Sequence, residues 1–495
     1  MENQGDIFEQ RKEKLEKIKK AGLEPYGRRF DKSLSIKELL ENFKEDAAAK
    51  LAGRIVAIRL HGKSSFGNIK DQTGKIQFYM KEDVVGQDNF KLFVDAIDIG
   101  DIIGIEGKTF KTRTGEPTLV VDKFVILSKS LRPLPEKWHG LKDVETRYRQ
   151  RYVDLIVNDD VRKIFEDRIK IANAIRAFLN ERGFLEVETP MMHRIAGGAA
   201  GKPFKTHHDA LNTDLYLRIA PELYLKKLLV GGFERVYEMN RSFRNEGIST
   251  RHNPEFTMLE IYQAYSDCQG MMKLTEELVA HVAKTVFNKM EFEYQGRKID
   301  LSEWKRISFP EMMKNVYDIT PEEETESWIK KLEAKGIKIE QRKNKLSRTQ
   351  LLNIISDLVT PESGGHPVFV FDVFTELCPL AKKKKDNPLL SDRFELFMAG
   401  MEVANAYSEL NDPIEQKQRF EEQAEMDKEA AVDEDFVRAL EYGMPPAGGL
   451  GIGIDRLTMI LTGAPSIRDV VLFPQLKPEE ASTNKDQTTL EGQDE

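Results

Sequence analysis

The sequence predicts an α+β fold in which a small β-barrel precedes a larger domain built on an antiparallel sheet flanked by helices. Residues 51–130 contain short β-rich runs separated by turn signals. From about residue 155 onward, helical and strand patterns mix without the regular βαβ repeat of a doubly wound protein. The chain has 495 residues, of which 40% are apolar and 32% charged, and this is enough for about three folding units with a sizeable core.

Composition argues against several classes of protein. No apolar run approaches the roughly 18 residues needed to cross a bilayer, and the polar N-terminal residues lack a signal-peptide pattern, so we expect a cytoplasmic protein with no membrane contact. Cys268 and Cys378 form no CxxC pair, which argues against a disulfide framework and a thiolate zinc site. The net charge of −8 argues against nonspecific nucleic-acid binding. The basic residues between Arg11 and Arg29 either gather into an RNA-binding surface or belong to a solvated helix of alternating charge, and the sequence favours neither.

The N-terminal part is predicted to contain a helical extension, a barrel and a linker. Residues 1–50 form the extension, with a polar helix over 8–22 that Gly22 ends. Residues 51–130 hold four β-rich runs and a hairpin turn at 71–74, which fits the about five short strands of an oligonucleotide-binding (OB) barrel. The four runs cover residues 53–58, 76–80, 102–105 and 118–121. Residues 131–154 contain prolines and many charges and are predicted to be the linker.

The larger domain is expected to span residues 155–476. Residues 303–375 are its least regular part and are predicted to be a helical insertion. The segment 477–495 has almost no apolar content and is predicted to be disordered.

A helix–strand junction begins this domain. Apolar residues follow helical spacing from Phe165 to Leu179 and include Ile169, and Gly183 closes the helix. A short strand over 184–189 then stops at Pro190, which cannot donate to a β-ladder. Taken alone, this junction is best explained by ordinary core packing.

Two strands joined by a charged loop form the most informative segment. The runs 236–244 and 255–263 are predicted to be strands, and the loop between them carries Arg244, Glu246, Arg251 and His252. Arginine side chains can bind phosphate oxygens through bidentate hydrogen bonds. The period of two in the second strand places four residues on one face: Phe256, Met258, Glu260 and Tyr262. On that face a buried glutamate needs a cationic partner, and Phe256 offers a flat surface for a base. A surface hairpin with salt bridges is the less favoured alternative.

A glycine-rich strand follows near the C-terminus. Gly449, Gly451 and Gly453 recur at every second residue, so they share a strand face on which a flat ligand or another backbone can lie. The segment matches neither the GxGxxG fingerprint nor a Walker loop, so any nucleotide would be held by a strand platform and arginines such as Arg456. Close backbone packing within a sheet is the alternative.

Residues 394–412 carry a further polar set. Asn405, Tyr407 and Glu409 fall on one face of a strand. Glu395 and Glu402 are seven residues apart and would converge only across a bend, for which Gly400 is the candidate. Two converging carboxylates beside a polyphosphate would hold Mg²⁺, whereas separate ones would simply face solvent.

The four segments together resemble the class II aminoacyl-tRNA synthetases, and most closely the lysine-specific members of bacterial type. The junction 183–190 is similar to motif 1, the loop 243–256 to motif 2, and the glycine strand ending at Arg456 to motif 3. The resemblance covers nearly the whole chain and implies a class II catalytic sheet, an OB barrel that reads the anticodon, and a homodimer. It also implies the ligands ATP, L-lysine and tRNA(Lys), with several Mg²⁺ ions accompanying ATP.

Matched residue by residue, the family pattern implies the following roles. Arg244 would bind the α-phosphate and the substrate carboxylate, and Arg456 the γ-phosphate, so that both are expected catalytic residues. ATP would contact Arg244, Glu246, His252, Asn253, Phe256, Gly451, Gly453 and Arg456, with Phe256 stacked on adenine. Lysine would contact Gly198 and Glu222 through its α-amino group, Asn405 through its carboxylate, and Glu260, Tyr262, Tyr407 and Glu409 through its side chain. The metal ligands would be Glu395 and Glu402, and the anticodon readers Phe66, Gln77 and Glu116. For Phe66 the alternative is a place in the barrel core.

The implied pocket favours a cationic substrate. It has three carboxylates, a tyrosine hydroxyl and no arginine facing the side chain, so an acidic substrate would be repelled. Tyr407 stands where many relatives have phenylalanine, and its hydroxyl needs a partner.

The resemblance implies a lysine–tRNA ligase reaction, in which ATP and lysine give lysyl-adenylate and the lysyl group then passes to the 3′ end of tRNA. Two other classes of function agree less well with the sequence. An RNA-binding paralogue without catalysis would have lost motif arginines and glycines, all of which are present. A ligase that attaches lysine to a protein would lack the barrel, whose residues 51–130 are intact.

Overall fold

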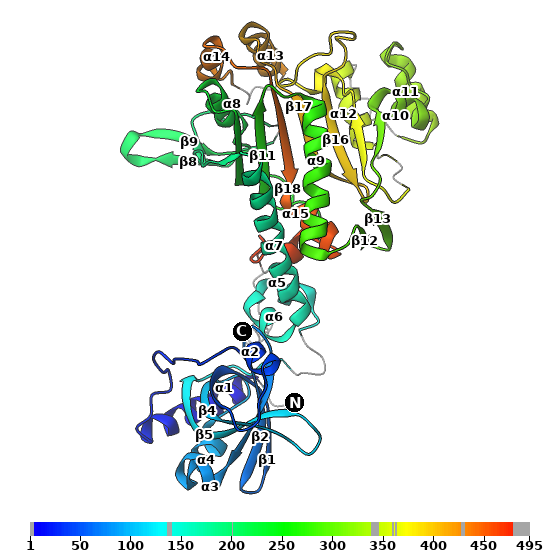
Figure 1. Ribbon diagram of the computed structural model, residues 1–495. Helices are drawn as coiled ribbons and strands as arrows, with labels where there is room; N and C mark the ends of the chain where they lie inside the picture. Colours follow the sequence, from blue (N-terminus) through cyan, green and yellow to red (C-terminus); the bar gives the residue numbers. More distant parts are fainter. Residues whose placement is uncertain are drawn as a thin grey trace, which may run out of the picture. The chain divides into compact units, whose positions relative to one another are not determined.

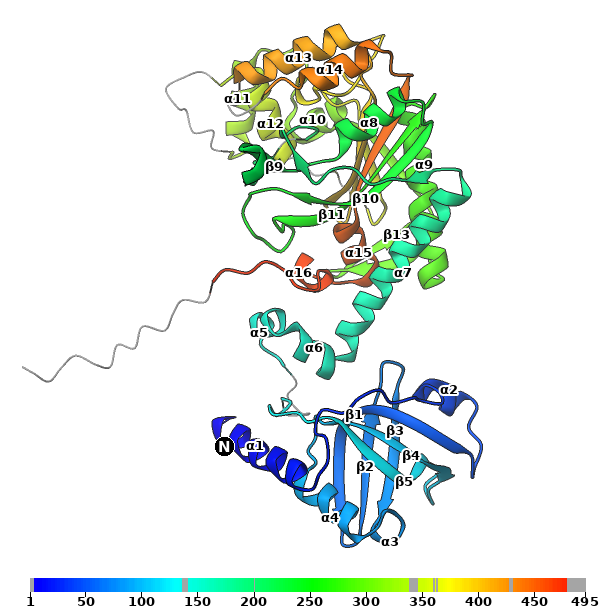
Figure 2. The same cartoon turned by 90° about the vertical axis from the view of Figure 1, so that its left-hand side faces the viewer.

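The computed structural model describes residues 4–135, 141–199, 201–337, 346–358, 361, 364–426 and 431–478. The chain divides into two compact units, residues 1–142 and 143–495, and each is described by itself (Figures 1 and 2). The predicted disordered tail, 477–495, lies outside the described residues from 479 onward. No helix within these ranges is long and apolar enough to cross a membrane.

The first unit is a closed five-stranded barrel with the strand order β1-β2-β3-β5-β4. Its strands are β1 (Ala48–His61), β2 (Ser64–Lys70), β3 (Lys75–Lys81), β4 (Ile102–Lys111) and β5 (Pro117–Ser128). In β1 every second residue from Ala49 to Ile55 is buried, because alternate side chains of a strand point into the barrel. The predicted turn at 71–74 is confirmed, since Asp71 Oδ1 accepts hydrogen bonds from the backbone of Thr73 (2.7 Å) and Gly74 (3.0 Å).

Four helices accompany the barrel: α1 (Gln4–Lys20), α2 (Ile36–Glu41), α3 (Glu82–Val85) and α4 (Gln87–Ala96). Arg11 and Lys14 are basic residues of α1 whose polar partners lie outside the helix. Arg11 is buried and donates to the carbonyls of Ile99 (3.0 Å) and Ser130 (3.1 Å), and Lys14 pairs with Asp98 at 2.6 Å. These two side chains therefore stabilise the unit instead of forming a basic surface.

The second unit is built on an eight-stranded sheet with the order β14-β15-β16-β17-β18-β11-β10-β6. Its strands are β6 (Leu185–Glu186), β10 (Arg235–Phe243), β11 (Glu255–Ala264), β14 (Lys305–Ser308), β15 (Val368–Phe371), β16 (Arg393–Met398), β17 (Met401–Ser408) and β18 (Ala447–Gly453). All pairs from β15 to β10 are antiparallel, and the two edge strands β14 and β6 are parallel to their neighbours. The predicted α+β class, with an antiparallel sheet and an N-terminal OB barrel, is confirmed.

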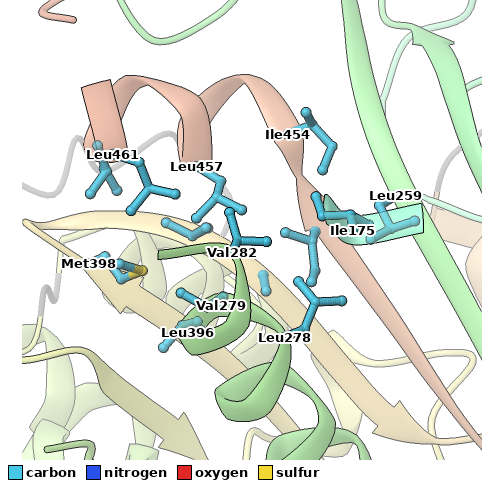
Figure 3. Packing of buried hydrophobic residues seen from close by; sticks show 14 of the residues in the cluster. Ile175, Leu259, Leu278, Val279, Val282, Leu396, Met398, Ile454, Leu457 and Leu461 are labelled. Carbon is cyan, nitrogen blue, oxygen red and sulfur yellow. The ribbon is translucent and has the colours of Figure 1, made fainter. Parts of the chain in front are cut away.

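One face of this sheet is covered by three helices: α7 (Asp159–Glu181), α9 (Cys268–Val282) and α15 (Ile454–Thr462). Figure 3 shows their packing, in which Leu278, Val279 and Val282 of α9 and Leu457 and Leu461 of α15 meet Leu259, Leu396 and Met398 from the strands. All eight side chains are at most 3% exposed. Burying a side chain of this size stabilises the fold by about 1.5–3 kcal/mol.

The opposite face of the sheet carries the polar and glycine positions of the predicted site. At one end it is packed by α8 (Glu222–Val230) and α14 (Glu434–Glu441), with α13 (Pro413–Met426) beside α14. The remaining helices are α5 (Val144–Arg149), α6 (Arg151–Val157), α10 (Phe309–Tyr317), α11 (Thr325–Ala334), α12 (Arg348–Leu358) and α16 (Ile467–Val470). A three-stranded sheet joins β7 (Met192–His193), β9 (Thr213–Leu217) and β8 (Lys205–His208), and β12 (Glu291–Tyr294) pairs with β13 (Arg297–Asp300). Short helical turns cover η1 (Asp209–Leu211), η2 (Ala283–Phe287) and η3 (Thr375–Leu377).

The structure differs from the sequence predictions around residue 150. The expected linker, 131–154, contains α5 and the first half of α6. These helices are tied to the second unit by charge: Arg151 is fully buried, pairs with Asp154 at 2.6 Å and donates to the carbonyls of Arg468 and Leu472. A buried ion pair gives no apolar periodicity, which is why the pattern suggested a linker.

Three further differences concern the main domain. The expected insertion, 303–375, begins and ends with β14 and β15, which belong to the central sheet, and it holds helices α10 to α12 between them. The expected strand 184–189 shrinks to the two residues of β6. Ile169, expected on the core face of α7, is 59% exposed, because the buried face of the helix passes through Phe165 and Ile171 instead.

Candidate active site

The sheet register aligns the predicted site residues in two rows. The first row consists of Glu238, Glu260, Gly451, Asn405 and Glu395. The second consists of Val236, Tyr262, Gly449, Tyr407 and Arg393. Successive rows are two residues apart along each strand, so both project from the same face. Glycines occupy the centre of both rows, which leaves a floor without side chains between β11 and β17.

Gly449 is the glycine that this floor requires most strictly. A Cβ atom added there would lie 1.8 Å from Glu409 Oε1 and 2.7 Å from the Tyr262 ring. At Gly451 the nearest atom would be the Met258 methyl at 3.2 Å, and at Gly453 the nearest would be 3.6 Å away. The carboxylate of Glu409 therefore lies directly over the bare backbone of Gly449.

Three carboxylates that the resemblance implied for the lysine pocket lie close together at this end of the floor. Glu222 and Glu260 are each 6% exposed and Glu409 is 1% exposed. Tyr262 lies among them and donates a hydrogen bond of 3.3 Å to Glu260 Oε2. Burial, together with the three surrounding carboxylates, raises the pKa of Tyr262 well above its usual value.

The acidic groups have strongly shifted acidities. Burial raises the pKa of Glu260 to about 8, with further contributions from Glu222 and Glu238. Burial also raises the pKa of Glu409 to about 8, although Lys226 opposes the shift. Among the described residues, neither oxygen of the buried Glu409 carboxylate has a partner of hydrogen-bond geometry, although Oε2 is ion-paired with Lys226. A cluster of buried carboxylates of this kind has the charge to receive a cation.

Lys226 is a member of this cluster that the sequence did not predict. Its Nζ lies 2.6 Å from Glu222 Oε1 and 2.5 Å from Glu409 Oε2, and its side chain is fully buried. The pocket was expected to hold three carboxylates, and the structure adds one internal cation to them. The spacing of four residues between Glu222 and Lys226 on a helix is the signal that could have suggested the pair.

Gly198 and Tyr407 both lie against Glu222. Gly198 has φ +89°, and a Cβ atom there would lie 3.1 Å from the Cβ of Glu222. The hydroxyl of Tyr407 donates to Glu222 Oε1 at 2.5 Å, which supplies the partner that this hydroxyl needs. Burial, followed by the charge of Glu222, raises the pKa of Tyr407 well above its usual value.

Arg244 lies at the other end of the floor beside Phe256. The guanidinium carbon is 5.1 Å from the Phe256 ring centre, and a Cβ at Gly201 would come within 2.9 Å of the Arg244 side chain. Burial lowers the pKa of Arg244, while the charges of Glu246 and Glu260 oppose this shift. Within the described ranges its buried Nε contacts no acceptor, so the guanidinium retains a donor for a ligand oxygen.

Arg456 is held close to the motif 2 loop. It donates to the backbone carbonyl of Glu402 at 2.7 Å, and another of its nitrogens is 3.2 Å from His252 Nε2. Burial, followed by the charge of Arg456, lowers the pKa of His252, so this imidazole is neutral. Asn253 donates to the carbonyl of Glu255 at 2.6 Å, whereas Glu246 is exposed on the same loop.

The predicted metal ligands, Glu395 and Glu402, lie on the same face of the sheet, but a β-bulge brings them together and not the expected bend. The pairing of β16 with β17 shifts after Leu396, because Ala404 pairs with Leu396 and Glu402 with Phe397. Val403 is therefore the extra residue of a β-bulge, and it turns Glu402 to the face that carries Asn405 and Glu395. The expected bend at Gly400 is only the hairpin turn. The Asn405 amide lies 3.4 Å from Glu402 Oε1.

The chemistry of this carboxylate pair fits a hard cation. Burial raises the pKa of Glu395, Arg393 lowers it by an ion pair of 2.7 Å, and the neighbouring Glu402 raises it. Oxygen ligands from Glu395 and Glu402, completed by phosphate and water oxygens, form the kind of set that Mg²⁺ takes.

The three predicted anticodon residues, all in the barrel, differ from one another in exposure. Phe66 is half-buried, stands outside the barrel core, and stacks on Tyr79 with ring centres 4.3 Å apart and an interplanar angle of 18°. Gln77 is 5% exposed, and its amide is engaged by Thr118 (2.9 Å) and Arg59 (3.1 Å). Glu116 is exposed and directly precedes β5.

Comparison with known proteins covers both units. Residues 143–477 match the family model described as tRNA synthetases class II (D, K and N), and residues 49–127 match that of the OB-fold nucleic acid binding domain.

Similar proteins match along their whole length. The lysine–tRNA ligase of Carboxydothermus hydrogenoformans is 54% identical over 494 residues, covering 97% of this chain and 100% of the relative. That of Pelotomaculum thermopropionicum is 54% identical over 489 residues (97% and 96%), and that of Thermotoga maritima 48% over 488 residues (96% and 96%). On the strength of this match, the motifs and the sheet that carries them, the chain belongs to the lysine–tRNA ligase family of class II aminoacyl-tRNA synthetases.

Proposed function

We propose that this chain activates L-lysine with ATP to lysyl-adenylate and pyrophosphate, and then transfers the lysyl group to the 3′ end of tRNA(Lys). The observation that carries the proposal is the cluster of three buried carboxylates, those of Glu222, Glu260 and Glu409. This cluster lies beside the bare backbone of Gly449, and the charge of Arg244 acts on Glu260. An amino acid with a cationic side chain satisfies these carboxylates, and its own carboxylate is then directed toward a guanidinium. Because tRNA charging supplies the ribosome, the proposed reaction is a cytoplasmic one.

Lysine binding uses both ends of the cavity. Glu222, with Gly198 close against it, receives the α-amino group, and Asn405 receives the carboxylate. The ε-ammonium lies among Glu260, Tyr262 and Glu409, and the Tyr407 ring packs on the methylenes. These assignments are supported by the register that places the strand residues in two adjacent rows.

ATP binding uses the arginine end of the floor. Phe256 stacks on adenine, the backbone of Gly451 and Gly453 lies beneath the nucleotide, and the motif 2 loop contributes Glu246, His252 and Asn253. Arg456 binds the γ-phosphate. Glu395 and Glu402 would hold Mg²⁺, which when bound supplies charge neutralisation to the phosphate oxygens.

In the first step a lysine carboxylate oxygen forms a bond to the α-phosphorus, and the bond to the β-phosphate oxygen breaks to release pyrophosphate. Arg244 orients both reactants and stabilises the charge that develops on the α-phosphate oxygens. In the second step a ribose hydroxyl of the tRNA end attacks the adenylate carbonyl, and AMP leaves. No side chain is needed as a nucleophile.

The barrel is proposed to read the anticodon. The half-buried Phe66 stacked on Tyr79 supports a platform for an unpaired base, with Gln77 and Glu116 near its edge. A homodimer is supported by large apolar residues left exposed along the junction segment: Ile169, Leu185, Met191 and Met192 are each at least half exposed.

Lysine-dependent ATP–pyrophosphate exchange, run against all twenty amino acids, tests the activity. We expect exchange with lysine far above that with any other amino acid. An equal or greater exchange with an acidic or neutral amino acid would refute the proposed substrate. Charging of tRNA(Lys) with labelled lysine tests the second step, and its absence alongside normal exchange would leave only the activation step standing.

A further inference from the structure

Lys226 is fully buried beside the proposed lysine pocket, and the reaction described above does not use it. It lies one helical turn after Glu222 on α8, so both side chains share a face. Its Nζ contacts Glu222 Oε1 at 2.6 Å and Glu409 Oε2 at 2.5 Å. Lysine is almost never fully buried unless it is paired, and here both partners are residues proposed to bind the substrate.

Each of the two carboxylates contacts Lys226 through one of its oxygens. On Glu409 the other oxygen, Oε1, is buried over Gly449 and has no hydrogen-bond partner in the described part of the chain. On Glu222 the Oε1 atom accepts both Lys226 and the hydroxyl of Tyr407 (2.5 Å), and no described residue bonds to Oε2. One oxygen of each carboxylate is thus kept for a ligand.

The charge of the pocket agrees with this division. When bound lysine favours the ionised form of all three carboxylates, these and the one ammonium of Lys226 leave two negative charges, which match the two positive charges of the substrate's ammonium groups. The other groups that face Lys226 are the rings of Tyr407 (5.5 Å) and Phe436 (5.9 Å), which are uncharged. Without Lys226, nothing would hold the carboxylate of Glu222 and that of Glu409 at their present separation, because Lys226 contacts both.

We propose that Lys226 is a positioning residue for substrate recognition, which holds Glu222 and Glu409 as two separate acceptors, one for each ammonium group of the amino acid. This inference rests on the proposed function, because it presumes that lysine fills the cavity. Lys226 of the chain would thereby contribute to the selection of the substrate lysine.

The test replaces Lys226 by methionine, which keeps the length of the side chain and removes its charge. We expect the KM for lysine in pyrophosphate exchange to rise at least about 30-fold, because a buried charge pair loses one member. The KM for ATP should stay within twofold, and Lys226→Arg should recover part of the loss. Lys227→Met is the matched control: Lys227 follows on the same helix but pairs with the exposed Asp435 (2.6 Å), so its loss should leave the lysine KM unchanged.

An unchanged lysine KM in the folded Lys226→Met variant overturns the inference, as does an equal rise in the KM values for lysine and ATP. If this variant does not fold, the double variant Lys226→Met/Glu409→Gln removes both charges and leaves no lone buried ion between them. We then expect a lysine KM about tenfold above that of Glu409→Gln alone, because Glu222 has also lost its partner; equal values overturn the inference. If the wild-type protein shows no lysine-dependent exchange, it is the proposed function that fails.

Discussion

Replacing Gly449 by alanine gives a stringent test of the proposed lysine pocket. The new methyl carbon would lie 1.8 Å from Glu409 Oε1 and 2.7 Å from Tyr262 Cε1. Non-bonded atoms reach a comfortable contact only at about 3.5 Å, so the carboxylate must retreat by more than about 1.5 Å. That movement disturbs the contact of Glu409 with Lys226, which is 2.5 Å long.

Two consequences follow for Gly449→Ala. Overpacking of this kind costs about 1–3 kcal/mol of the free energy of unfolding, which a thermal melt detects as a lower Tm. Displacing a buried charge from its ligand costs about 2–5 kcal/mol, so the lysine KM in pyrophosphate exchange should rise by about 30-fold or more. The KM for ATP should change little, because the clash involves no residue assigned to the nucleotide.

Gly453→Ala is the matched control on the same strand. Its added Cβ would meet no atom closer than 3.6 Å, which is an ordinary contact. We expect this variant to keep the lysine KM of the wild type, and to raise the KM for ATP because the nucleotide is proposed to lie there. A folded Gly449→Ala protein with a lysine KM within threefold of the wild type would show that Glu409 does not contact the substrate over this glycine.

Three further predictions concern the arginines at the end of β10 and in the loop after it, the acidic groups and the barrel. Arg244→Ala should lower kcat in pyrophosphate exchange by about 100-fold or more, since it removes a donor to the transition state; Arg241→Ala, whose loose ion pair with Glu255 (3.5 Å) is half exposed, is the control and should retain normal exchange. Lysine affinity should fall as the pH is lowered below about 8, because Glu260 and Glu409, with pKa values of about 8, then carry protons that the bound ammonium must displace. Calorimetry in buffers of different ionisation enthalpy should record net proton release on binding, and a pH-independent affinity between pH 6 and 8 would contradict the buried acidic pocket. Phe66→Ala should weaken tRNA(Lys) binding by about tenfold in a filter assay while leaving exchange without tRNA intact, because one base loses its stacking partner; undiminished binding would remove Phe66 from the reading surface.

The strand patterns predicted most of the site, because a period of two and a run of alternate glycines have a direct geometric meaning. Knowing that Glu260, Tyr262, Asn405 and Tyr407 alternate with core residues is enough to place them on one face. The convergence of Glu395 with Glu402 could not be predicted in this way. It depends on the bulge at Val403, and a bulge arises from pairing between strands, which a single strand's pattern does not contain.

Buried charge was the other limit on what the sequence could predict. Lys226 and Arg151 both look like exposed basic residues of a helix, yet both are fully buried. Besides a local carboxylate on its own helix, Lys226 contacts Glu409, and Arg151 donates to the carbonyls of Arg468 and Leu472, which the fold brings to them. For Ile169 the prediction is wrong in the opposite direction. Its apolar side chain fits the core pattern of α7, but it is exposed on the surface of the unit. The exposure of these three residues is decided by whether other parts of the fold pack against them, and not by their own hydrophobicity.

The acidic pocket is a source of instability in the free protein and of affinity in the complex. The pKa of Glu260 is about 8 in the folded chain against an ordinary 4.5, so between these values the folded protein binds more protons than the unfolded one. The contribution of this group to stability is therefore fully present below pH 4.5 and is lost as the pH rises through 8. A bound ammonium lowers the pKa of Glu260 again, because it favours the ionised carboxylate that burial disfavours. The same desolvation that destabilises the empty site thus strengthens the interaction with a cation, and a neutral amino acid of equal size would leave the destabilised charges unmatched.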